Sequence, residues 1–120
     1  MSIQSSLLVL IVLVGVWFFY SKASDLDPLL AKKMVHDGAI LLDVRTPAEF
    51  EAKHIEGAIN IPISELEQRH EELGDNGKVI IVYCASGVRS ARAKKLLKLK
   101  GFGHTHNLGG ISRWLPDIKN

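Results

Sequence analysis

The feature that most constrains the fold is an apolar run from Val79 to Tyr83, immediately before the single cysteine of the chain, Cys84. The run is rich in β-branched residues and shows no alternation of apolar and polar side chains, which is typical of a strand buried on both faces. Such strands occur almost only in parallel sheets covered by helices. The run therefore predicts an α/β domain with a largely parallel central sheet flanked by helices.

Segments of helical and strand character alternate around this run, as the fold requires. Capping boxes at Thr46–Glu49 and Ser64–Glu67 each predict the start of a helix, and Pro28 after Asp27 predicts a third. The expected helices cover residues 28–37, 47–53, 65–73, 90–100 and 111–115, and the further strands cover 40–44, 59–61 and 104–108.

Charged residues are unevenly distributed along the chain. All 15 Lys/Arg and all 13 Asp/Glu lie from Lys22 onward, so residues 1–21 carry no charged side chain. The sequence therefore predicts one hydrophobic helix over residues 1–21, a short linker over 22–26 and a single globular domain over 27–120.

The uncharged leader has the composition of a membrane segment. Leu7 to Tyr20 is continuously apolar, and a helix from about Ile3 to Tyr20 would be near the lower length limit for a membrane span. We expect a single-pass anchor, with a cleaved signal peptide as the alternative. Lys22, Lys32 and Lys33 follow the apolar run, which favours a cytoplasmic domain and leaves a periplasmic one open.

Composition excludes several other functions. A net charge of +2 is too small to indicate nucleic-acid binding. A single cysteine excludes an intrachain disulfide framework and a zinc site with several cysteines. His104 and His106 alternate on an expected strand but lack a third ligand nearby, so we predict no metal and no cofactor.

Cys84 ends the buried strand, and the next residues, Ala85 to Ser90, lead into a helix. The unpaired N–H groups and the dipole of that helix would lower the pKa of the thiol, and Arg89 would add a full positive charge. Gly87 would let successive N–H groups curl inward around an anion. A buried, inert cysteine is the alternative for an isolated thiol, but these neighbours favour a nucleophile.

The loop from Cys84 to Ser90 resembles the Cys-x-x-Gly-x-Arg-Ser/Thr loop of rhodanese-type sulfurtransferases. Two upstream stretches, Asp43–Phe50 and His54–Pro62, and one downstream stretch, Leu108–Trp114, resemble the other motifs of that family. The resemblance extends over about residues 27–118. It departs at Lys53, where the family usually has Gly; we expect that difference to alter a turn rather than the chemistry.

The resemblance implies a rhodanese-like fold and a two-step reaction. Cys84 would take sulfur from thiosulfate or a persulfide donor, becoming a persulfide, and would pass it to a thiol or cyanide acceptor; a partner protein could be donor or acceptor. Asp43 and Arg45 would support the loop. The substrate-binding residues would be Ala85, Ser86, Gly87, Val88, Arg89 and Ser90.

Three alternatives stay open on the sequence. Related phosphatases have five residues between Cys and Arg, whereas four separate Cys84 from Arg89, which suits sulfur better than phosphate. A sulfur carrier supplied by a partner protein would use the same residues as an enzyme. A non-catalytic binding module is disfavoured by the intact Cys84, Gly87 and Arg89.

Overall fold

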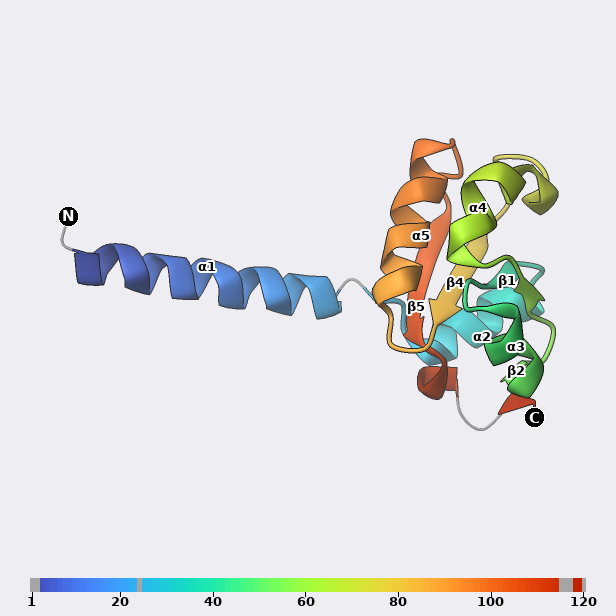
Figure 1. The fold of residues 1–120 in the computed structure, drawn as a ribbon, viewed down its shortest axis with the longest axis horizontal. Coiled ribbons are helices and arrows are strands. Elements are labelled where there is room, and N and C mark those ends of the chain that lie inside the picture. The colour runs from blue at the N-terminus through green and yellow to red at the C-terminus, as the bar shows by residue number, and fades with distance from the viewer. Residues whose placement is uncertain (1–2, 24, 115–117, 120) are drawn as a thin grey trace.

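The computed structural model describes residues 3–23, 25–114 and 118–119. A long helix, α1 (Ile3–Ala23), extends away from an α/β domain in Figure 1. The main sheet of the domain has four strands in the order β3-β1-β4-β5, and every neighbouring pair is parallel. The parallel sheet flanked by helices that the sequence predicted is thus confirmed.

The main sheet consists of β1 (Ile40–Asp43), β3 (Ile59–Asn60), β4 (Ile80–Cys84) and β5 (Thr105–Gly110). The helices of the domain are α2 (Pro28–His36), α3 (Pro47–Ala52), α4 (Ile63–Arg69) and α5 (Val88–Leu99), with two 3₁₀ turns, η1 (His70–Leu73) and η2 (Ile111–Trp114). A second, antiparallel pair joins β2 (His54–Ile55) to β6 (Ile118–Lys119), a pairing that the sequence did not predict.

The central strand β4 is completely buried and separates two apolar cores. Val82 and Cys84 belong to one core, together with Leu66 of α4 and Leu97 of α5. Alternate residues of β4, such as Tyr83, belong to the other core, which α2 and η2 cover from the opposite face. Burial on both faces explains why the strand lacks polar residues.

Local capping signals explain two of the helix starts. The Asp27 carboxylate accepts a hydrogen bond from the Leu30 N–H at 3.2 Å at the start of α2. At α3, Thr46 and Glu49 form both hydrogen bonds of the predicted capping box.

Two predicted helix starts are wrong by a short distance. The box expected at Ser64 does not form, because α4 already begins at Ile63, whose N–H donates to the Val44 carbonyl at 3.0 Å. Helix α5 begins at Val88 rather than Ser90, since Gly87 adopts a left-handed conformation and turns the chain two residues earlier.

The predicted membrane anchor is wrong. The hydrophobic helix expected before the domain is present as α1, but no helix within the described parts of the chain is long and apolar enough to cross a membrane. The continuous apolar run, Leu7 to Tyr20, is bordered by Ser6 and Ser21. At about 1.5 Å per residue it extends about 21 Å, against about 30 Å for a bilayer core. The membrane localisation and membrane partner inferred from that anchor are therefore withdrawn.

Candidate functional site

Cys84 is the last residue of β4, and its side chain is buried. Figure 1 shows the end of β4 next to the start of α5, with β5 alongside. In parallel sheets, ligands bind beyond the carboxyl ends of the strands, where connecting loops and helix starts supply polar groups. The thiol therefore lies where this architecture forms its binding sites.

Polar groups of the following loop converge on the sulfur atom. The Gly87 N–H donates to Sγ of Cys84 at 3.0 Å, and the Ser90 hydroxyl oxygen lies 3.4 Å from the same atom. Burial alone would raise the pKa of the Cys84 thiol. Hydrogen bonds from the Ser90 hydroxyl and from the backbone N–H groups of Ser90, Gly87 and Ser86 outweigh burial and lower that pKa below its ordinary value.

The curvature of this loop depends on glycine. Gly87 has a φ of 101°, which disfavours any residue with a side chain. Strand β5 also packs closely against the loop, because a Cβ added at Gly110 of β5 would lie 2.8 Å from the Ala85 carbonyl oxygen. The two glycines let the backbone fold closely around Sγ while β5 supports it.

Five of the six predicted substrate-binding residues divide into two groups. Gly87 and Ser90 contact Sγ directly, and Ser86 reaches it through its backbone N–H. Ala85 and Val88 are exposed, with Val88 67% accessible. Those two side chains border the loop instead of contacting the sulfur.

Arg89 is engaged differently from the sequence-based expectation. Its two terminal nitrogens donate to the two carboxylate oxygens of Glu49 on α3, at 2.7 and 3.0 Å. This bidentate hydrogen bonding holds the pKa of Glu49 at about 2. The two side chains remain 30% and 33% exposed, so the pair lies at the rim of the site.

Glu49 is the site residue that sequence reasoning missed. The capping-box pattern correctly placed its carboxylate at the start of α3, where it also accepts from the Thr46 N–H at 3.0 Å. Its second partner, Arg89, is separated from it by 40 positions along the chain. No local pattern indicates such a contact.

Asp43 and Arg45 form a second ion pair at the carboxyl end of β1. The Arg45 guanidinium donates to Asp43 at 2.7 to 3.1 Å and to the Lys53 carbonyl at 2.6 Å, and both side chains are buried. Lys53 participates through its backbone in an extended conformation with φ of −165°, which any residue adopts. The departure from the family motif at Lys53 is thus compatible with this contact.

Metal ligands do not cluster in the described parts of the chain, where no group of three His, Cys, Asp or Glu side chains is placed to hold an ion. The polar groups around Sγ are N–H and hydroxyl donors, which suit an anion. The arrangement can therefore stabilise a thiolate, or a negatively charged group attached to it.

Comparison with known proteins identifies the same region. A family model described as a rhodanese-like domain matches residues 27–117. An uncharacterized Bacillus subtilis protein, YqhL, is 46% identical over 82 residues, which cover 68% of this chain and 64% of that protein. The chain thus spans somewhat less than two thirds of YqhL.

Comparison with Escherichia coli gives both a curated relative and a solved structure. The thiosulfate sulfurtransferase PspE is 38% identical over 80 residues, covering 65% of this chain and 77% of PspE. A solved structure described as a rhodanese with anions superimposes with a TM-score of 0.64 and 33% identity, covering 68% of this chain and 96% of that one.

Proposed function

The chain belongs to the rhodanese-like domain family, and from this premise we propose that it is a sulfurtransferase in which Cys84 carries a sulfane sulfur as a persulfide. The observation that carries the proposal is the convergence of the Gly87 N–H and the Ser90 hydroxyl on Sγ. A buried cysteine with an ordinary packing role has no need of such donors.

The first step loads the sulfur. The Cys84 thiolate attacks the outer sulfur of a donor such as thiosulfate, a sulfur–sulfur bond forms, and the bond within the donor breaks with release of sulfite. The two negative charges of thiosulfate leave on sulfite, and the charge of the thiolate moves to the terminal sulfur of the persulfide. No metal or redox partner is required for this exchange.

The second step unloads the sulfur. A thiolate or cyanide ion attacks the terminal sulfur, and Cys84 leaves as the thiolate that began the cycle. Covalent catalysis of this kind predicts ping-pong kinetics. The backbone N–H groups of Ser86, Gly87 and Ser90 would hold the negative charge of the persulfide as an oxyanion hole holds that of an oxygen.

Arg89 would bind the anionic donor at the rim of the site. Its guanidinium already binds a carboxylate in a bidentate manner, and a sulfonate group offers oxygens of similar geometry. Because the pair with Glu49 is partly exposed, an anionic donor can exchange with Glu49 at little cost.

A second candidate function is favoured by the same pair. Glu49 neutralises Arg89 and places a negative charge near the mouth of the loop, which opposes thiosulfate. A carrier that receives sulfur from a partner protein would not need to attract a small dianion. The two functions therefore differ in the donor and not in the chemistry at Cys84.

Assay of the purified chain with thiosulfate and cyanide tests the proposal and separates the candidates. We expect thiocyanate formation that Cys84→Ser abolishes, with circular dichroism showing that the variant stays folded. Persulfide on Cys84 from a persulfide donor, without thiosulfate turnover, would instead identify the carrier. If no donor modifies Cys84, sulfur transfer is wrong.

A further inference from the structure

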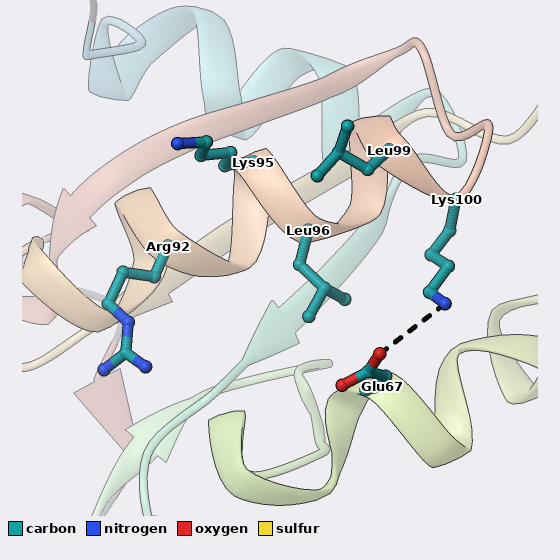
Figure 2. Close-up of a pocket in the computed structure, with 6 residues that line it drawn as sticks. All are labelled: Glu67, Arg92, Lys95, Leu96, Leu99 and Lys100. Atoms are coloured by element: carbon teal, nitrogen blue, oxygen red, sulfur yellow. Dashed lines mark ion pairs between the residues drawn. The ribbon is translucent and has the colours of Figure 1, made fainter.

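A groove of about 440 Å³ lies on the α5 surface that faces α4, separate from the polar groups around Cys84. Figure 2 shows Leu96 and Lys100 pointing from α5 toward Glu67 of α4, while Leu99 lies on the side of α5 away from Glu67. Leu99 is 80% exposed. The residues that line the groove are Glu67, Arg92, Lys95, Leu96, Leu99 and Lys100.

The charges in the groove are predominantly positive. Glu67 is the single carboxylate of the lining, and it lies 3.8 Å from the Lys100 ammonium. Arg92 and Lys95 form no ion pair with any other residue in the described parts of the chain. An occupant that complements this surface has apolar groups for the leucines and negative charges for the two unpaired cations.

Arg89 of the Cys84 site lies on the same face of α5 as residues of the groove. Arg89, Arg92, Leu96 and Leu99 follow one another at spacings of three or four residues, so they share one face of α5. The first of them, Arg89, belongs to the loop around the thiol. From Arg89 to Leu99 the face extends about 15 Å along the helix axis.

We propose that this groove docks an acidic, partly apolar segment of a partner protein that exchanges sulfur with Cys84. The inference rests on the proposed function and names the class of partner for it. A segment of about five extended or ten helical residues would cover the groove. Docked along α5, it brings the residue that follows it to the loop that holds Cys84.

The exchange needs no further reactant. A partner thiolate attacks the terminal sulfur of the Cys84 persulfide, the new sulfur–sulfur bond forms on the partner, and Cys84 leaves as a thiolate. The same step in reverse loads Cys84 from a partner persulfide. Docking accelerates either direction by raising the local concentration of the partner thiol.

Binding of a fluorescent peptide to the full chain tests the proposal. The probe is a short peptide of alternating Leu and Glu ending in cysteine, and its counterpart carries Lys in place of Glu. By fluorescence anisotropy we expect the acidic peptide to bind at least about tenfold more tightly than the basic one. The double variant Arg92→Glu/Lys95→Glu should abolish that preference.

Two exposed lysines outside the groove provide a matched control. Lys78→Glu/Lys98→Glu changes the net charge of the chain by the same amount and should leave the affinity for the acidic peptide within about twofold. Equal weakening by the two double variants would show that net charge alone acts, and would overturn the proposal. So would binding of anionic phospholipid vesicles through Arg92 and Lys95 with no preference for the acidic peptide.

The proposed function is checked separately on the same samples. Persulfide formation on Cys84 from thiosulfate and, separately, from a small persulfide is measured by mass spectrometry without the peptide. A sample that binds the peptide through Arg92 and Lys95 but never forms a persulfide supports the docking surface and contradicts sulfur transfer. A sample that forms the persulfide but ignores peptide charge contradicts the docking surface alone.

Discussion

Two arginine–carboxylate pairs lie in the same domain and differ chiefly in burial. Arg45 and Asp43 are 4% and 0% exposed, and Arg45 also donates to the Lys53 carbonyl. Arg89 and Glu49 are 30% and 33% exposed and form a comparable bidentate contact. Geometry is thus similar in the two pairs, whereas access to solvent is not.

The difference in burial separates a structural pair from an exchangeable one. Removing one partner of a buried pair leaves a charge without solvent or counterion, which costs several kcal/mol. A partly exposed pair exchanges one anion for another at little cost, because water screens both charges. Arg45 therefore supports the end of β1, while Arg89 is available to an anionic ligand.

The largest effect is expected at the buried pair. Asp43→Ala should lower the free energy of unfolding by about 3–5 kcal/mol, because Arg45 would remain buried and unpaired. Urea denaturation measures this loss. Glu49→Gln is the control, and it should lower the free energy of unfolding by less than about 1 kcal/mol. Similar losses for the two variants would show that burial does not distinguish the pairs.

Arg89→Ala should affect the reaction rather than stability. Loss of a charged hydrogen-bonding group should slow persulfide formation from thiosulfate by about 10–100-fold. The free energy of unfolding should change by less than about 1 kcal/mol. Stopped-flow loading with thiosulfate and alkylation by uncharged iodoacetamide check the assignment, since the reaction with the anionic donor should be slowed far more strongly. An unchanged rate with thiosulfate would remove Arg89 from donor binding.

The hydroxyl of Ser90 should control the ionisation of Cys84. Ser90→Ala removes a donor to Sγ and should raise the pKa of the thiol, so that less thiolate exists at pH 7. The alkylation rate with iodoacetamide at pH 7 should fall by a few-fold to about tenfold, and its pH profile should shift to higher pH. Ser86→Ala is the matched control, because it keeps the backbone N–H. Equal shifts in both variants would contradict the role of the hydroxyl.

The smallest effect concerns pH and Glu49. The pKa of Glu49 is about 2 in the folded chain, below about 4.3 in an unfolded one, so its ionised form favours folding. Its contribution is complete above about pH 5 and is lost as the pH falls toward 2. As the pH falls from about 5 to 2, the free energy of unfolding should decrease more for the wild type than for Glu49→Gln. The difference between the two decreases should be less than about 1 kcal/mol. Parallel pH curves would show that the pair adds nothing to stability.

Signals in the sequence are reliable where they are local. The uninterrupted apolar run before Cys84 predicted the central strand, and the spacing of Thr46 and Glu49 predicted the start of α3. The position of Gly87 predicted a curled loop, because only its neighbours along the chain determine that turn. In each case the interacting groups lie within a few residues of one another.

Contacts between distant segments could not be read in the same way. The Glu49–Arg89 pair, the β2–β6 pairing and the groove between α4 and α5 depend on how whole elements pack. For the hydrophobic leader, a local apolar pattern led to a wrong prediction of a membrane anchor. Its apolar composition was recognised, but the uninterrupted run is shorter than a membrane crossing requires.

The mass of Cys84 after exposure to a sulfur donor tests the central claim most directly. The full chain is incubated with thiosulfate, and separately with a small persulfide, and analysed intact by mass spectrometry alongside Cys84→Ser. We predict a gain of one sulfur atom at Cys84 that a thiol removes and that the serine variant never acquires. An unmodified Cys84 after both donors, in a chain shown to be folded, would contradict the account.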